Sequence, residues 1–184
     1  MSNNDSPKPS EATAAPLRSR AQRWYRHILE GLLLVLAFVL LSQWLSRHLL
    51  DDGSQLPDMT LAQLNTPSDM TLSWPAQQPK TLIYFFAPWC SVCRISMPGL
   101  NTLDSSEQLR IVAIALDYQT VSEVEAFIAD TGFRHPVLLG NDALRDTFKI
   151  SGYPSYYVVN RQGQVIHKDR GLSTPPGLWL RTRL

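Results

Sequence analysis

The chain has 184 residues, of which 17 are Lys or Arg and 16 are Asp or Glu, so its formal net charge is +1. A hydrophobic content of 44% suffices for a packed core and excludes a wholly disordered chain. The near-neutral charge gives no argument for a nucleic-acid partner, and two cysteines are too few for a disulfide-rich scaffold or a four-cysteine zinc site.

An apolar segment near the N-terminus predicts a single transmembrane helix. Residues 1–27, rich in Pro, Ser and Arg and without an apolar period, are expected to form a disordered tail. Ile28–Leu45 is nearly all apolar, and as a helix it spans about 27 Å, enough to cross the hydrocarbon layer of a membrane. Trp24, Tyr25 and Trp44 stand where interfacial aromatic side chains belong.

The charges of the tail predict the orientation of this helix. Basic residues outnumber acidic ones before the apolar segment, which keeps the tail in the cytoplasm and places the rest outside. In a bacterium this is an inner-membrane protein whose C-terminal domain lies in the periplasm. A buried soluble helix is rarely apolar on every face, and a cleaved signal peptide needs small residues that Ser42–Arg47 does not offer. We therefore expect an uncleaved signal anchor.

Residues 46–60 are predicted to form a short polar tether, and residues 61–184 an α/β domain. Strands are predicted at Thr81–Phe86, Arg110–Leu116, Pro136–Leu139, Ser155–Val159 and Gln164–Lys168, the last two joined by a hairpin turn at Asn160–Gly163, with weaker strand signals at Thr60–Leu64 and Met70–Trp74. Helices are predicted at Ser91–Gln108, Val121–Asp130, Asp142–Phe148 and Pro175–Arg183. Pro98 is expected to bend the first helix, Gly132 to end the second and either Asn141 or Asp142 to cap the third. This alternation predicts a mixed central sheet with helices on both faces.

The two cysteines, Cys90 and Cys93, follow a strand that is apolar on both faces and stand at the start of a helix. The unpaired N–H groups and the positive end of that helix favour a thiolate on Cys90. Cys93 lies one turn further on, close enough to attack a mixed disulfide on Cys90 and release the partner. We therefore predict Cys90 as the nucleophile and Cys93 as the resolving cysteine, with Trp89 offering an apolar contact to incoming chains.

Other roles for the cysteine pair are open at this point. Two buried, inert cysteines or a structural disulfide would explain the pair without any chemistry. Half of a metal site, copper delivery included, would need His135 or His167 as a further ligand, and we expect no metal. A peroxidase is disfavoured because Ala87 stands where a Ser or Thr would help to bind peroxide.

The sequence around the cysteines resembles a known family. The W-C-x-x-C turn after a buried strand looks like that of the thioredoxin superfamily. The string Cys90–Pro98 is similar to the C-x-x-C-R-x-E-M-P run of the membrane-anchored TlpA/ResA-like, or DsbE-like, thioredoxins. Val121–Leu139 resembles the extra αβ insertion of that family, and Gly152–Val159 is similar to the stretch that holds its cis-proline. The resemblance covers about residues 55–175.

The resemblance implies a thioredoxin fold and thiol–disulfide exchange with protein clients, with no cofactor beyond the cysteine pair. It also implies that the Tyr153–Pro154 bond is cis and packs against the dithiol, so that the main chain of Tyr153 can pair with a client strand. Trp89, Tyr153 and Pro154 are therefore expected to bind the substrate. A trans proline that merely begins a strand is the alternative.

Two positions depart from the family pattern. Thioredoxins carry a buried Asp six residues before the first cysteine, where this chain has Tyr84, and the TlpA/ResA-like run has a Glu where this chain has Ser96. Either acid would accept the proton of the second cysteine. Water, the Tyr84 hydroxyl or a carboxylate such as Asp117 are left as candidates for this role. Arg94, next to the second cysteine, is expected on the solvated helix surface.

The sequence therefore predicts a membrane-tethered periplasmic oxidoreductase that reduces protein disulfides and is recharged by a membrane electron donor. The pair between the cysteines, Ser91 and Val92, lacks the histidine of strongly oxidising sites, which disfavours a disulfide oxidase. A further alternative is a non-catalytic module that docks a partner or holds copper. That alternative predicts that Cys93→Ala leaves function intact, whereas the enzyme predicts that it traps covalent partners.

Overall fold

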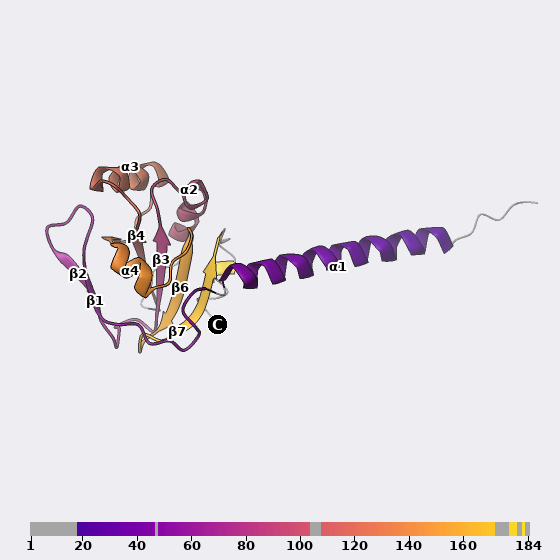
Figure 1. The fold of residues 1–184 in the computed structure, drawn as a ribbon, viewed down its shortest axis with the longest axis horizontal. Coiled ribbons are helices and arrows are strands. Elements are labelled where there is room, and N and C mark those ends of the chain that lie inside the picture. Colours follow the sequence, from indigo (N-terminus) through magenta and orange to yellow (C-terminus); the bar gives the residue numbers. More distant parts are fainter. Residues whose placement is uncertain (1–17, 47, 104–107, 172–176, 180–181, 183–184) are drawn as a thin grey trace, which may run out of the picture. The chain divides into compact units, whose positions relative to one another are not determined.

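The computed structural model describes residues 18–46, 48–103, 108–171, 177–179 and 182 (Figure 1). The chain divides into two compact units, Met1–Leu41 and Ser42–Leu184, and each is described by itself. The disordered tail predicted for residues 1–27 lies outside the described residues up to residue 17. From Arg18 onward the chain is helical, so the prediction of a disordered tail is wrong for residues 18–27.

Helix α1, Arg18–Ser46, contains the predicted membrane segment. Its stretch Trp24–Leu41 is long and apolar enough to cross a membrane, and none of it is buried inside the protein. Leu, Val and Phe side chains are exposed on all sides of the helix, as in a segment whose apolar surface faces something other than a protein core. Trp24 and Tyr25 are exposed as well, whereas the side chain of Trp44 lies outside the described residues.

The second unit is built on a five-stranded mixed sheet with the order β5-β4-β3-β6-β7. Its strands are β3 (Lys80–Phe86), β4 (Leu109–Ala115), β5 (Val137–Leu139), β6 (Ser155–Asn160) and β7 (Val165–Arg170). β3, β4 and β5 run parallel, while β6 runs antiparallel to β3 and β7 antiparallel to β6. All five predicted strands are confirmed, and the mixed sheet is the one that their order predicts.

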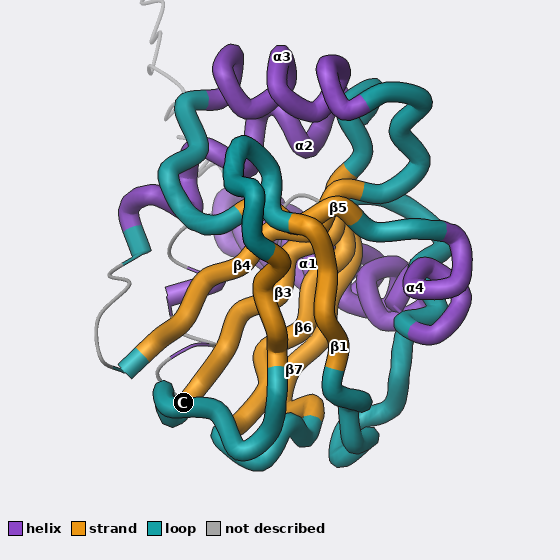
Figure 2. Tube along the Cα trace, turned by 90° about the vertical axis from the view of Figure 1, so that its left-hand side faces the viewer, coloured by secondary structure: helices purple, strands orange, loops and turns teal. Residues whose placement is uncertain are grey.

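Helices cover both faces of this sheet. Alternate residues of β3 point to opposite sides, so they pack with different helices. Tyr84 and its neighbours on one side pack with α2 (Ser91–Ser96) and α3 (Val121–Thr131). Phe85 on the other side packs with Phe148, at the end of α4 (Asp142–Thr147), with the two ring centroids 4.9 Å apart. Figure 2 shows α2 and α3 together and α4 apart from them. β3 is therefore buried on both faces, as its continuous apolar run predicts.

The helix predicted for Ser91–Gln108 is wrong in its extent. The α-helix ends at Ser96, and η1 (Met97–Thr102) continues as a 3-10 helix with Pro98 in its first turn. Proline lacks the N–H that an α-helix needs inside its length, so the change of helix type at this residue has a direct cause. The other two caps are confirmed: Gly132 ends α3 at a φ of +61°, and Asn141 accepts the N–H of Leu144 at 2.9 Å. Of the last predicted helix, 175–183, residues 177–179 and 182 are described, and they are helical.

The two strands that the sequence indicates weakly pair with each other, and the first segment also reaches the large sheet through an isolated bridge between Gln63 and Leu138. β1 (Met59–Ala62) and β2 (Asp69–Leu72) form a separate antiparallel sheet. The predicted hairpin between β6 and β7 is also present, and Gly163 adopts a φ of +84° there. A Cβ at this position would overlap the ring of Trp74, so the turn requires glycine in both conformation and space.

Residues that the composition assigns to the tether contribute to the core. Leu49 and Leu56 each retain only 2% exposure and belong to the same core cluster as Phe85. The N–H of Leu56 donates to the carbonyl of Gly163 at 2.9 Å, and the N–H of Leu50 donates to the Tyr157 hydroxyl at 3.0 Å. The packed domain thus begins at Leu49, well before its first strand, β1.

Candidate active site

The turn after β3 carries the disulfide. The chain enters α2 through Cys90, the N-cap residue, whose backbone is extended with φ −80° and ψ 107°. Cys90 and Cys93 are joined by a disulfide, so the two predicted reactive residues lie together. Cys93 is fully buried, whereas 6% of Cys90 remains exposed. Cys90 is therefore the cysteine that a partner reaches first.

A main-chain N–H of α2 points at Sγ of Cys90, the more exposed of the two cysteines. The N–H of Cys93 donates a hydrogen bond to Sγ of Cys90 at 3.1 Å. The first N–H groups of a helix have no partner within the helix, so a side chain at the N-cap receives them. A donor on this sulfur favours the thiolate over the thiol once the disulfide is reduced.

The loop before β6 lies beside the disulfide. Its Tyr153–Pro154 bond is cis, as the resemblance implies, and the trans alternative is wrong. Tyr153 packs against the core cluster that contains both cysteines, and its ring meets that of Trp89 edge-on, with 5.7 Å between centroids. Among the described residues, no main-chain group bonds to the N–H or C=O of Tyr153.

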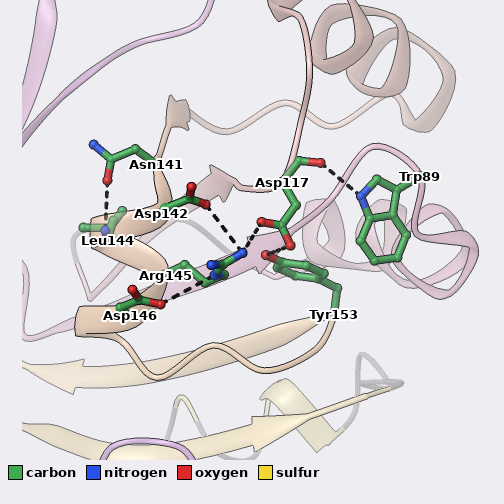
Figure 3. Close-up of polar contacts among 8 residues, drawn as sticks. All are labelled: Trp89, Asp117, Asn141, Asp142, Leu144, Arg145, Asp146 and Tyr153. Carbon is green, nitrogen blue, oxygen red and sulfur yellow. Dashed lines mark hydrogen bonds and ion pairs between the residues drawn. The ribbon is translucent and has the colours of Figure 1, made fainter.

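A charged cluster around Asp117 adjoins this loop (Figure 3), and the sequence, which names Asp117 only as a candidate proton acceptor, does not indicate its contacts. The carboxylate of Asp117 accepts the hydroxyl of Tyr153 and the guanidinium of Arg145, each at 2.9 Å, and its carbonyl accepts the indole N–H of Trp89 at 3.0 Å. Burial and the bonded carboxylate raise the pKa of Tyr153, which therefore stays protonated as a donor. The one available signal was that Asp117 follows a parallel strand next to β3, at the same sheet edge as Cys90.

The two positions that depart from the family pattern bond to each other. The hydroxyls of Tyr84 and Ser96 are 2.7 Å apart, and Ser96 also donates to the carbonyl of Val92 at 2.9 Å. A serine has a single hydroxyl proton, so Tyr84 must be the donor in the first bond. Burial raises the pKa of Tyr84 well above its ordinary value, so this hydroxyl keeps its proton at neutral pH. Tyr84 therefore serves as a hydrogen-bond donor to Ser96, and the Asp117 carboxylate bonds to Tyr153 and Arg145.

The remaining candidates lie outside this chemistry. Arg94 is on the helix surface as expected, where it forms an ion pair with Asp130 and stacks over the ring of Phe127 at 5.0 Å. His135 packs edge-on against Phe133, and burial lowers its pKa. No group of three or more His, Cys, Asp or Glu residues suited to a metal ion occurs among the described residues.

Comparison with known proteins agrees with this geometry. The Redoxin family matches residues 51–177. The chain belongs to the Redoxin family. Within the family it is a thioredoxin-like protein of the TlpA, ResA and DsbE type, as the string Cys90–Pro98 predicts.

Among the similar proteins are several that are named thiol-disulfide oxidoreductases. Thioredoxin-like protein YneN of Bacillus subtilis is 23% identical over 120 residues, which cover 63% of this chain and 69% of that protein. Thiol-disulfide oxidoreductase ResA of Oceanobacillus iheyensis is 28% identical over 128 residues, 66% of each chain. The crystal structure of StoA from Bacillus subtilis shares the fold with a TM-score of 0.60 and 21% identity, over 68% of this chain and 96% of that one. The chain is accordingly an enzyme of the thiol–disulfide oxidoreductase class.

Proposed function

We propose that this Redoxin-family protein is a membrane-tethered reductase of protein disulfides that works in the bacterial periplasm. The observation that carries the proposal is the asymmetry of the cysteine pair. Cys90 stands at a helix N-terminus, partly exposed, and accepts an N–H on its sulfur, whereas Cys93 is fully buried one turn behind it. This arrangement suits one cysteine to attack and the other to resolve.

The reaction has two exchange steps. The thiolate of Cys90 attacks one sulfur of a client disulfide, the client S–S bond breaks, and one client sulfur leaves as a thiolate that takes up a proton. The thiol of Cys93 then loses its proton and attacks Sγ of Cys90, which releases the second client thiol and forms the Cys90–Cys93 disulfide. Two electrons and two protons have passed to the client, so the client is reduced and the enzyme is oxidised.

Three residues would hold the client for this exchange. The N–H and C=O of Tyr153 can pair with an extended client segment in the manner of an added strand. The cis Pro154 sets the direction of that loop, and the exposed ring of Trp89 supplies an apolar wall. The proposed binding residues are therefore Trp89, Tyr153 and Pro154.

The proposed direction of electron flow is supported by the family resemblance and by the residues between the cysteines. Ser91 and Val92 place neither a histidine nor another cation there, and it is such a group that stabilises the reduced form in strongly oxidising proteins. A reductase in an oxidising compartment must be recharged. The electrons would come from the thiols of a membrane protein that attack the Cys90–Cys93 disulfide.

A trapping experiment tests the catalytic roles. In Cys93→Ala the mixed disulfide on Cys90 cannot be resolved, so we expect covalent complexes that disappear on treatment with dithiothreitol. The matched variant Cys90→Ala keeps Cys93 but lacks the exposed nucleophile, and we expect it to capture nothing. Full activity of Cys93→Ala without any adduct would instead support a non-catalytic docking module.

The membrane arrangement is a separate part of the proposal. Residues 1–27 would form a cytoplasmic tail and Ile28–Leu45 the uncleaved signal anchor. The periplasmic domain would follow from Leu49, earlier than the predicted boundary at residue 61, because Leu49 and Leu56 are buried in its core. The apolar, exposed side chains of α1 support a membrane-spanning role. Protease added to intact spheroplasts should digest the C-terminal domain, and protection of that domain would overturn the orientation.

A further inference from the structure

The carboxylate and main-chain oxygens of Asp117 accept hydrogen bonds from three different parts of the molecule (Figure 3). Its two carboxylate oxygens take Tyr153, from the cis-proline loop, and Arg145, from α4, while its main-chain oxygen takes Trp89 from the disulfide-bearing turn. Asp117 also has a φ of +49°, a conformation that costs free energy in a residue other than glycine. Asp tolerates this region better than most residues because its short side chain forms local hydrogen bonds.

The two aromatic side chains beside Cys90 depend on this residue for their placement. Trp89 is 66% exposed, so packing holds little of its ring. The contacts that the structure describes for the indole are the carbonyl of Asp117 and the ring of Tyr153. Tyr153 in turn is fixed at its hydroxyl end by the Asp117 carboxylate. Removing the carboxylate therefore frees Tyr153 directly and Trp89 through it.

The carboxylate is itself held in place from α4. The Arg145 guanidinium bonds to Asp117 at 2.9 Å and also pairs with Asp142 at 3.5 Å and with Asp146 at 3.7 Å. Three carboxylates around one guanidinium restrict its position, and the Asp117 oxygen that faces it is restricted with it. The second oxygen is thereby presented to Tyr153.

We propose that Asp117 is a positioning residue that fixes Trp89 and Tyr153 at the separation an extended polypeptide requires, and so selects polypeptide disulfides over small ones. The inference rests on the proposed function, because it assumes that clients lie along Tyr153. A small disulfide needs only to reach Sγ of Cys90, whereas a polypeptide must also meet the indole of Trp89 and the main chain of Tyr153. Loss of Asp117 therefore affects the larger substrate selectively.

Two substitutions remove this contact in different ways. Asp117→Gly removes both carboxylate oxygens, keeps the main-chain carbonyl and tolerates the φ of +49°. In Tyr153→Phe the carboxylate and its ion pair stay, and only the hydroxyl is lost. Glu125→Gln is the control for loss of one surface carboxylate, since this exposed α3 residue has no described bond to Arg145, Tyr153 or Trp89.

The experiment uses the full chain in detergent micelles, reduced beforehand and freed of reductant. Its single-turnover oxidation is followed with insulin and with bis(hydroxyethyl) disulfide, each over a range of concentrations. The concentration dependence separates the half-saturating concentration from the limiting rate for each disulfide. The readout is the ratio of the second-order rate constants for insulin and for the small disulfide.

Asp117→Gly is expected to raise the half-saturating concentration of insulin about tenfold and to lower the ratio by the same factor. Adding Tyr153→Phe to Asp117→Gly should lower the ratio no further, because both substitutions remove the same bond. Glu125→Gln should leave the ratio unchanged. A ratio that stays constant in both Asp117→Gly and Tyr153→Phe overturns the inference. The proposed function fails by a different result, namely a reduced wild-type chain that neither disulfide oxidises.

Discussion

Two polar clusters lie near the disulfide, and they differ in charge because they differ in access to water. The pair Tyr84 and Ser96 is buried behind Cys93 and carries no charge, whereas Asp117 and Arg145 are partly exposed and form an ion pair. Burying a carboxylate costs far more free energy than burying a bonded hydroxyl. The buried position where the family pattern expects an acid is thus occupied by groups that stay neutral. The charged groups, Asp117 and Arg145, lie at the partly exposed rim of the site.

The largest effect is expected when a carboxylate is placed in the buried cluster. Tyr84→Asp and the matched Tyr84→Asn both remove a buried ring, which should lower the free energy of unfolding by about 3–5 kcal/mol. Burial raises the pKa of the new carboxyl in the folded state, so the Asp variant is relatively most stable below the unfolded pKa of about 4 and loses stability as pH rises. Urea unfolding at about pH 5 and pH 8 measures the difference, and parallel behaviour of Asp and Asn would contradict it.

The same two variants also examine the proton of Cys93. If no internal base serves this thiol in the wild type, an Asp at position 84 should speed the release of client from the mixed disulfide relative to the Asn variant. Rapid-quench measurement of the released thiol gives both rates. Equal rates would show that a base at this position does not limit resolution.

A smaller effect should reveal the direction of the Tyr84–Ser96 bond. Ser96→Ala leaves the buried Tyr84 hydroxyl without an acceptor and should cost about 1–3 kcal/mol of unfolding free energy. Tyr84→Phe leaves Ser96 bonded to the carbonyl of Val92 and should cost about 1 kcal/mol or less. Denaturant titrations compare the two, and a larger cost for Tyr84→Phe would reverse the assigned donor.

On the opposite face of the sheet, Tyr157 contributes to the free energy of unfolding in a way that depends on pH. Its hydroxyl donates to the carbonyl of Phe148 at 2.6 Å and accepts the N–H of Leu50. Burial raises the pKa of Tyr157 to about 12, so its contribution to stability is complete below the unfolded value of about 10 and is lost as pH rises towards 12. Between about pH 10 and about pH 12, the free energy of unfolding should fall less steeply with pH in Tyr157→Phe than in the wild type. Identical slopes would refute a shifted tyrosine.

The smallest effect is expected at the charged rim. Arg145→Gln removes the ion pair with Asp117 but leaves the buried pair intact, so the melting temperature should fall only slightly. The difference from the wild type should vanish in about 1 M NaCl, where the screening length is about 3 Å. The buried Ser96→Ala difference should persist in the same salt. A salt-independent loss in Arg145→Gln would mean that the two clusters do not differ as described.

The sequence predicts the sheet well, because its signals are local. Continuous β-branched and aromatic runs such as Thr81–Phe86 mark buried strands, and residues such as Gly132 and Asn141 end or cap helices by their own backbone and side-chain preferences. The extent of the first helix was mispredicted because Pro98 changes the helix type instead of only bending it. The separate pairing of β1 with β2 depends on contacts between distant segments, which local patterns do not encode.

The sequence predicts those parts of the site whose residues lie close together in the chain. Cys90 and Cys93 stand out by spacing, and the cis bond before Pro154 follows from the family resemblance. Arg145 could not be found in this way, since only the packing of α4 against the sheet edge brings it to Asp117. The bond between Tyr84 and Ser96 likewise joins two departures from the pattern that the sequence presents as unrelated.

The early burial of Leu49 has a consequence for shedding of the domain. A protease that cut between Leu50 and Met59 would release a fragment without Leu49, and a cut after Leu56 would remove Leu56 as well, which leaves a gap in the core that includes Phe85. Such a fragment should unfold and be degraded, because large apolar side chains lost from a core leave cavities. Cleavage able to liberate a lasting redox domain is thereby confined to the few peptide bonds ahead of Leu49.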